Sequence, residues 1–296
     1  MSISSQRLGF ILVLVSAFAF ASKTILAKLC YQYGVDPITV LAIRMTFAGA
    51  FFGSVLAINL IKGHWSLKLT GPQWLWAVVL GLCGYYLSSL LDFSGLVYVD
   101  AYLGRMILFL YPTLVVLINS FLNRIPVGPT TWLALGLCYG GIILMMLPQL
   151  GSESKNIWLG SALIFMAALI FALYLVGVDR LLKSIDPIRF TSLVMSISCL
   201  GVLTHFFISN NVGDLTAAPR PVFIYGFIMG IFSTVLPIYT LAMGISRIGA
   251  SKAAMISMMG PVLTTIMGIS LLNERLTLIQ TAGMVLVMAG VWRVGK

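Results

Sequence analysis

The sequence predicts an all-α integral membrane protein with ten transmembrane helices, and three observations lead to this fold class. Hydrophobic residues make up 60% of the 296 residues and charged residues only 9%, whereas a soluble chain carries about 25% charged residues. The mean hydropathy is +1.05. The apolar runs are continuous and about 20 residues long, which suits a bilayer-spanning helix and not the alternating strands of a barrel. A soluble enzyme, a secreted disulfide scaffold and a disordered linker are therefore excluded.

Ten apolar segments follow one another along the chain, separated by short connections. The connections contain Pro, Gly and Asp, which end helices, and none is long enough for a domain outside the membrane. The first segment resembles a signal peptide, but its apolar run continues past Ala21 to Cys30, which favours an uncleaved helix. The predicted spans cover residues 8–30, 37–61, 73–91, 99–122, 131–147, 157–178, 187–209, 221–243, 249–272 and 279–294.

Basic residues are distributed unevenly between the two sides of the predicted membrane. With the N-terminus inside, nine Lys and Arg fall in the inner segments and three in the outer loops. Cytoplasmic loops collect such residues, so we expect both termini in the cytoplasm of a multi-pass protein of the bacterial inner (plasma) membrane. The same bias accounts for most of the net charge of +10, and no nucleic-acid partner is expected.

The two halves of the chain resemble each other. The segment GVDPITVLAIRM at 34–45 matches SIDPIRFTSLVM at 184–195, and Pro112 matches Pro261 at an offset of 149. Each copy holds five spans, an odd number, so the second copy enters the membrane upside down. We therefore expect two inverted repeats, 7–147 and 157–293. Such a scaffold can open to either side, which favours alternating access, although a duplication kept only for packing is an alternative.

Two stretches of the chain resemble the fourth-helix signature of EamA-type transporters, which belong to the drug/metabolite transporter superfamily. They are LGRMILFLYPTLVVLINSFLNR at 103–124 and GASKAAMISMMGPVLTTIMGISLLNERLT at 249–277. The second copy keeps the terminal Glu274-Arg275, whereas the first has Asn123-Arg124 and no Glu. The resemblance implies a ten-helix bundle around a central cavity and, most often, export of amino acids or related metabolites. Uptake of a metabolite such as S-adenosylmethionine or riboflavin is the alternative.

Ionisable residues inside the predicted spans are the first candidates for substrate binding. A charged side chain in the bilayer costs about 3 kcal/mol or more, so it should face a cavity or a partner. Lys23, Arg44, Arg105 and Lys252 lie in spans, and Asp92 ends the third span. Because cations outnumber acids, the cavity should prefer a carboxylate or another anion. Arg105 is a candidate partner for Asp92 across adjacent helices, as an outer gate or a static ion pair, and the sequence leaves open whether the two residues pair. For Lys252, snorkelling to the interface is an equal alternative.

Four tyrosines lie deep within the predicted spans, namely Tyr86, Tyr111, Tyr174 and Tyr239. A buried tyrosine hydroxyl needs a hydrogen-bond partner, so some of the four should face the cavity and contact substrate. Plain core packing is the alternative.

Prolines and glycines within the spans predict how the helices bend and pack. Pro112, Pro237 and Pro261 should kink their helices, and the freed carbonyls can shape a cavity or a hinge. Three pairs of glycines lie four residues apart within a span, and we predict close helix packing at each pair. The pairs are Gly49/Gly53, Gly136/Gly140 and Gly226/Gly230.

The sequence contains no catalytic constellation, metal-ligand spacing or cofactor motif. We therefore predict a protein that is not an enzyme, needs no metal or cofactor, and has a small molecule and the lipid bilayer as partners. A complete internal repeat favours a functional monomer. A channel and a membrane-embedded enzyme remain the weaker alternatives.

Overall fold

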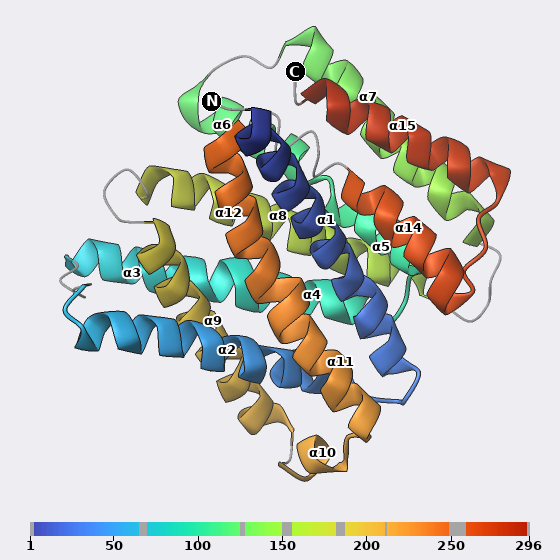
Figure 1. The fold of residues 1–296 in the computed structure, drawn as a ribbon. Coiled ribbons are helices and arrows are strands. Elements are labelled where there is room, and N and C mark those ends of the chain that lie inside the picture. Colours follow the sequence, from blue (N-terminus) through green and yellow to red (C-terminus); the bar gives the residue numbers. More distant parts are fainter. Residues whose placement is uncertain are drawn as a thin grey trace.

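The computed structural model describes residues 3–64, 70–124, 128–149, 156–181, 187–210, 212–248 and 259–294. Helices dominate these ranges and no strand occurs in them, so the predicted all-α class is confirmed. The described chain begins and ends on the same side of the bundle (Figure 1). In chain order the helices are α1 (Ile3–Tyr31), α2 (Pro37–Ile61), α3 (Gly71–Gly81), η1 (Leu82–Leu87), α4 (Ser88–Gly95), α5 (Ala101–Leu108), α6 (Tyr111–Asn123), α7 (Pro129–Met146), η2 (Leu147–Gln149), α8 (Ile157–Leu181), α9 (Pro187–Ser209), α10 (Val212–Ala217), α11 (Arg220–Gly230), η3 (Ile231–Val235), α12 (Leu236–Ile248), α14 (Met259–Leu272) and α15 (Leu278–Val294).

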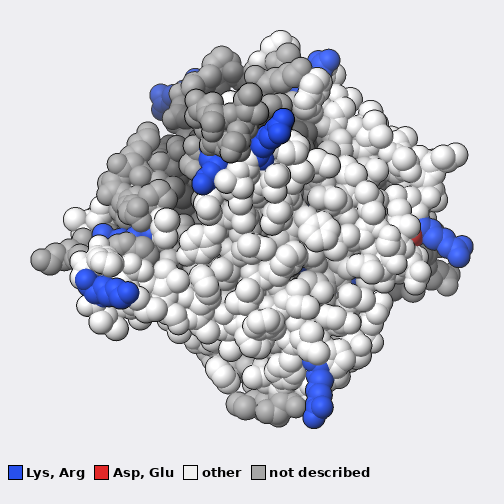
Figure 2. Space-filling model, viewed as in Figure 1, with Lys and Arg blue, Asp and Glu red and all other residues white. Residues whose placement is uncertain are grey.

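Seven helical stretches of the described chain are long and apolar enough to cross a membrane. They are Gln6–Tyr31, Pro37–Ile61, Gly71–Gly95, Ala101–Leu122, Ile157–Gly177, Ile188–Ser209 and Arg220–Leu241. Three shorter apolar helices, Trp132–Met146, Met259–Leu272 and Leu278–Gly290, lie where the remaining spans were predicted. Most of the Lys and Arg on the face drawn in Figure 2 lie toward its edges, with wide uncharged areas between them. The protein is therefore a multi-pass membrane protein.

The helices begin where the sequence supplies a cap. Asp36 precedes α2, and its carboxylate accepts hydrogen bonds from the backbone N–H groups of Ile38 and Thr39, each at 3.1 Å. Pro37 then opens the helix, where its missing N–H costs nothing. At the start of α3, the side chain of Gln73 accepts a hydrogen bond from the Thr70 N–H at 2.9 Å.

Helices that are distant in sequence pack side by side. The helix α15 lies along α7, α1 lies against α12 and α14, α8 lies against α4 and α6, and α2 lies against α9 (Figure 1). At the crossing of α7 and α15, a Cβ added to Gly141 would lie 2.5 Å from the carbonyl oxygen of Gly283, and a Cβ on Gly283 would lie 2.5 Å from that of Gly141. Only glycine allows backbones to approach this closely.

The predicted glycine spacings pack to different degrees. Gly226 and Gly230 both press against α2, as expected, and Gly49 touches Cys199 of α9. Cβ atoms added to Gly53, Gly136 or Gly140 would meet nothing within 4 Å. The Gly136/Gly140 prediction was therefore wrong, because the face of α7 that meets α15 contains Gly141 instead.

Several contacts between the first and the second half of the chain occur in corresponding pairs. A Cβ on Gly95 of α4 would lie 2.7 Å from the Gly160 carbonyl of α8, and one on Gly244 of α12 would lie 3.3 Å from the Gly9 carbonyl of α1. The Ser88 hydroxyl donates to the Ala167 carbonyl at 3.0 Å, and the Ser16 hydroxyl donates to the Pro237 carbonyl at 2.9 Å.

The third and eighth predicted spans are each interrupted by a π-helical segment. These segments, η1 and η3, begin at Leu82 and Ile231, 149 residues apart. A π-helix is rare and is found mostly at functional positions of longer helices. The segment η1 contacts α8 and α9, and η3 contacts α1 and α2.

The three prolines predicted to shape the spans lie near helix starts. Pro112 is the second residue of α6, directly after the break that separates α5 from α6. Pro237 is the second residue of α12 and follows η3, and Pro261 is the third residue of α14. At least one carbonyl near these prolines is hydrogen-bonded, because the Thr113 hydroxyl donates to the Leu110 carbonyl oxygen at 2.7 Å. A hinge role stays a prediction.

Candidate functional site

The centre of the candidate site is an ion pair between α1 and α4. The Lys23 Nζ atom lies 2.7 Å from the Asp92 Oδ2 atom, and the two side chains are 12% and 4% exposed. The contact is both a salt bridge and a hydrogen bond, donated by the Lys23 ammonium to the Asp92 carboxylate. A hydrogen-bonded charge pair at this depth is strong, and breaking it leaves an uncompensated charge.

Arg44 of α2 is the second cation of the site and is 3% exposed. Its Nε donates to the Thr234 hydroxyl oxygen at 3.0 Å, and that hydroxyl donates in turn to the Met229 carbonyl at 2.8 Å. Gly226 and Gly230 approach α2 closely, and a Cβ on Gly230 would lie 2.8 Å from the Arg44 carbonyl oxygen. Because η3 begins directly after Gly230, this approach brings η3 to Arg44. The Arg44 Nη1 atom is buried and has no hydrogen-bond partner among the described residues.

Arg105 of α5 is the third cation. Its guanidinium lies against α14, where a Cβ added to Gly260 would meet the Arg105 Nη2 atom at 3.2 Å. The Arg105 Nε atom is buried without a partner in the described part of the chain. The candidate pair between Asp92 and Arg105 is not formed, because the Asp92 carboxylate is bound to Lys23 while Arg105 packs against Gly260.

The charges of the site do not balance within the described residues. Asp92 interacts electrostatically with Lys23, Arg44 and Arg105, and among the described residues no other carboxylate does so with any of the three. Asp92 therefore compensates one cation and leaves two guanidiniums with unused donor atoms. Arg guanidiniums present donors in a fixed fork that matches a carboxylate or phosphate. The arrangement can bind an anion.

The predicted tyrosines divide between the site and its surroundings. Tyr111 of α6 and Tyr174 of α8 join Tyr85 of η1 around the Phe171 ring. The centroids of the Tyr111 and Phe171 rings are 5.2 Å apart, as are those of Tyr85 and Tyr174. Tyr85 interacts electrostatically with Arg44, and Tyr111 does so with Arg105. Tyr85 and Tyr111 therefore border the cationic cluster, whereas Tyr174 packs against Tyr85.

Three predicted residues are not brought to the cluster by any described contact. The Tyr86 hydroxyl lies 3.0 Å from the His205 Nδ1 atom of α9, so its hydrogen bond is made outside the cluster. The Tyr239 ring packs on Phe51 with centroids 6.1 Å apart. Lys252 lies outside the described residues. Both tyrosines pack against the main apolar core, and contact of either one with substrate stays a prediction.

Sequence reasoning missed Thr234 and Phe93. Thr234 follows Ser233 in an otherwise apolar span, three residues before Pro237, and this polar pair was the available signal. Ser233 also belongs to the site, since its hydroxyl lies 2.7 Å from that of Ser22 on α1. Phe93 follows Asp92 directly, but nothing in the sequence predicts that its ring contacts Lys23 and Arg44.

Glu274 joins the loop after α14 to the start of α5. Its Oε1 atom accepts a hydrogen bond from the Ala101 N–H at 2.6 Å, and its Oε2 atom accepts one from the Tyr102 N–H at 3.4 Å. A carboxylate at a helix N-terminus stabilises the exposed N–H groups and the helix dipole. Burial raises the pKa of Glu274 above its ordinary value, while the two backbone donors oppose the shift. The glutamate of the quoted signature therefore fixes the helix that carries Arg105.

Apolar helices surrounding a buried, net cationic polar cluster define a multi-pass α-helical membrane protein. The model of the EamA-like transporter family matches residues 7–147 and 158–295, and the chain belongs to this family. The resemblance seen in the sequence is thereby confirmed.

Known proteins similar to this chain span most of its length. The uncharacterized transporter YcbK of Bacillus subtilis is 32% identical over 93% of this chain and 88% of its own. An uncharacterized transporter of Archaeoglobus fulgidus is 24% identical over 90% of this chain and 92% of its own. A solved crystal structure covers 98% of this chain and 97% of its own with a TM-score of 0.61 and 21% identity, a likeness of fold alone.

Proposed function

We propose that this protein is a secondary transporter that moves a small carboxylate-bearing metabolite, such as an amino acid, by alternating access. One observation carries the substrate class: Arg44 and Arg105 keep buried donor atoms without partners beside a carboxylate that is bound to Lys23. Relatives from a bacterium and an archaeon carry the name transporter, which supports transport as the task.

The physical argument for an anionic group rests on the cost of burying charge. A buried donor without a partner costs about 1–3 kcal/mol, and more when it is charged. A substrate carboxylate that reaches the Arg44 Nη1 and Arg105 Nε atoms would recover this cost. A substrate whose only charge is positive would meet three cations and one engaged acid, and Coulomb repulsion would oppose its entry.

Residues 7–147 and 157–293 form two inverted five-span repeats in this proposal, ten spans in all. The exchanged glycine contacts of α4 with α8 and of α12 with α1 support the repeat. The reciprocal bonds made by Ser88 and Ser16, and the placement of η1 and η3, support it as well. Repeats of this kind exchange conformations to open a site to one side and then to the other, with Pro112, Pro237 and Pro261 at the bends.

The proposed location is the cytoplasmic (inner) membrane, with both chain ends in the cytoplasm. The described chain begins and ends on the same side of the bundle, which ten spans require (Figure 1). Export is the proposed direction, and uptake of a metabolite such as S-adenosylmethionine or riboflavin is the alternative. Fusions of a reporter that is active only in the cytoplasm to the C-terminus would test the topology.

Thermal unfolding of the detergent-purified protein with amino acids, keto acids and cationic amines tests the substrate class. A ligand at 100 times its Kd should stabilise the fold by about 2.7 kcal/mol. Carboxylates should raise the Tm of the wild type, and Arg44→Gln and Arg105→Gln should abolish the shift. Arg220→Gln, at an exposed residue outside the cluster, is the matched control. Stabilisation by cationic amines alone would refute the anion site.

Flux measurements then test transport itself. Proteoliposomes loaded with the stabilising carboxylate should exchange it with a labelled external pool, and the flux should saturate with concentration. Flux that grows linearly without saturation would indicate a channel, and a chemically altered product would indicate an enzyme. Inverted and right-side-out vesicles from cells would separate export from uptake.

A further inference from the structure

The ring of Phe93 contacts both cations that flank Asp92. The Lys23 Nζ atom lies 5.7 Å from the ring centroid and the Arg44 Cζ atom lies 5.4 Å from it. Both distances fall within the range of cation–π attraction. The residue is fully buried, and its carbonyl accepts a hydrogen bond from the Tyr31 hydroxyl at 2.8 Å.

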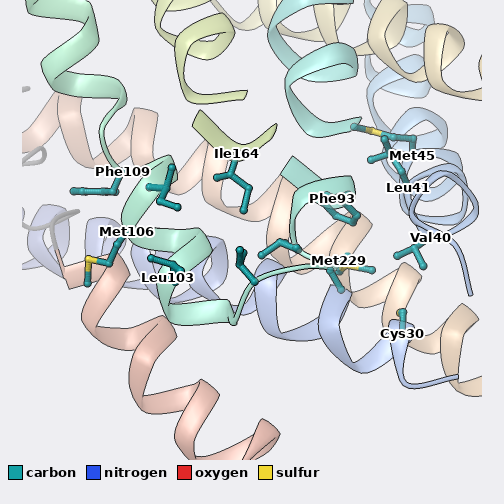
Figure 3. Close-up of a cluster of buried hydrophobic side chains, with 14 of the residues drawn as sticks. Cys30, Val40, Leu41, Met45, Phe93, Leu103, Met106, Phe109, Ile164 and Met229 are labelled. Atoms are coloured by element: carbon teal, nitrogen blue, oxygen red, sulfur yellow. The ribbon is translucent and has the colours of Figure 1, made fainter. Parts of the chain in front are cut away.

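The surroundings fix the ring as well. Phe93 belongs to the main apolar core, together with Leu41 and Met45 of α2. Figure 3 shows Phe93 on α4 beside these α2 side chains. The ring therefore lies against the helix that carries Arg44, and its position is determined by packing as much as by the two cations.

Arg44 makes no hydrogen bond to Asp92, although the two residues interact electrostatically. The Arg44 Nε atom is bound to Thr234, its Cζ atom lies over Phe93, and its Nη1 atom has no partner in the described chain. Asp92 directly precedes Phe93 in the sequence, and its carboxylate is paired with Lys23. One carboxylate cannot neutralise two cations, so the negative face of the Phe93 ring compensates part of the remaining positive charge.

We propose that Phe93 is a positioning residue that determines selectivity for carboxylates. Its ring holds the Arg44 guanidinium away from Asp92, so the Nη1 donor stays available to a substrate anion. Lys23 then keeps Asp92 occupied. This inference rests on the proposed function, because it assumes that a substrate carboxylate binds Arg44.

Fluorinated phenylalanine tests the ring without changing its packing. Each added fluorine weakens the negative face of the ring, so incorporation of monofluoro- and then trifluoro-phenylalanine at position 93 should lower carboxylate affinity stepwise. The probes are L-leucine, L-glutamate and 4-methyl-2-oxopentanoate, and L-leucinamide, which lacks the carboxylate, is the negative control that should bind neither protein. The trifluoro protein should bind the best of the three carboxylates about fivefold more weakly than the wild type, whereas its Tm without ligand should stay close to that of the wild type.

A double-mutant cycle separates positioning from general damage. Phe93→Leu keeps an apolar side chain but removes the aromatic face, and it should weaken carboxylate binding at least as much as trifluorination. In the Asp92→Asn background the same substitution should have little effect, because Arg44 no longer has a competing acid to pair with.

The outcomes distinguish this inference from the function on which it rests. If the wild type binds none of the three carboxylates, the proposed anion site fails and the role of Phe93 fails with it. If the wild type binds them and Arg44→Gln abolishes binding, but fluorination leaves the affinity unchanged or raises it, only the role of Phe93 is refuted. A ligand-free Tm that falls on fluorination would show general damage to the fold and would refute it too.

Discussion

Lys23 and Asp92 lie 69 residues apart in the sequence, and their side chains meet at 2.7 Å as a buried ion pair between α1 and α4. This pair explains why Arg105 is not bound to Asp92. It also leaves Asp92 unable to compensate Arg44 fully. The two arginines therefore become the residues with unused donors, and they are the centre of the proposed anion site.

The two partners of this ion pair should respond unequally to substitution. Asp92→Asn removes the only carboxylate that acts on the three cations within the described chain. Lys23→Met instead leaves Asp92 with Arg44 and Arg105 as alternative partners. Breaking a buried pair costs about 3–5 kcal/mol, so Asp92→Asn should lower the Tm clearly more than Lys23→Met. Thermal unfolding followed by tryptophan fluorescence would measure both, and equal losses would count against the charge arrangement.

Thr234 should stabilise the fold through its hydroxyl. Thr234→Val keeps the branched shape but removes the acceptor of the Arg44 Nε atom, whose bond is 3.0 Å long. A buried, charged donor left unpaired should cost about 1–3 kcal/mol. Thr234→Ser keeps the hydroxyl and is the matched control, so its loss in Tm should be the smaller one. Similar losses in both variants would mean that packing of the methyl group, and not the hydrogen bond, matters there.

The close packing of α7 against α15 can be tested with two glycine substitutions in α7. Gly141→Ala places a Cβ about 2.5 Å from the backbone oxygen of Gly283, so the two helices must separate. Gly136→Ala on the same helix meets nothing within 4 Å and should leave the Tm unchanged or slightly higher. If both variants unfold at the same temperature, α7 and α15 do not pack as described.

Glu274 should make stability depend on pH. Because burial raises its pKa, the folded protein binds a proton more readily than the unfolded chain above the ordinary glutamate pKa. The fold therefore loses stability as the pH rises through the raised pKa, and the wild-type Tm should fall between about pH 5 and about pH 8. Glu274→Gln keeps an acceptor for the Ala101 N–H and carries no charge, so its Tm should change less over this range.

A second substitution at Glu274 separates charge from hydrogen bonding. Glu274→Ala removes the acceptor for the Ala101 N–H at every pH and should be less stable than Glu274→Gln throughout. A wild-type Tm that rises with pH, relative to Glu274→Gln, would contradict the direction of the pKa shift.

The helices could be predicted because their signals are local. Runs of apolar residues of sufficient length, punctuated by pairs such as Asp36-Pro37, define where a helix begins and ends without reference to any neighbour. The three interruptions of the spans were harder to predict. Pro112 indicated the break between α5 and α6, and Pro237 lies two residues after η3, whereas η1 has no local signal that distinguishes it from ordinary helix.

The candidate site could be predicted only as a set of residue types. Lys23, Arg44, Asp92 and Arg105 are conspicuous because ionisable residues are costly in an apolar helix. Their pairing could not be predicted: the adjacency of the third and fourth spans made Arg105 a candidate partner for Asp92, and the sequence left that pairing open. The structure pairs Asp92 with Lys23 of α1, whose contact with the other helices cannot be read from the order of the spans.

The sequence by itself determined the class of the protein, the helical segments, the family resemblance and the excess of buried positive charge. These depend on composition and on spacing along one helix. Only the tertiary structure decided which cation Asp92 pairs with. It also decided that Arg44 contacts Thr234 and Phe93, and that α7 and α15 touch at Gly141 and Gly283. Such contacts join residues far apart in the chain, and their distances depend on how helices cross, which no local pattern specifies.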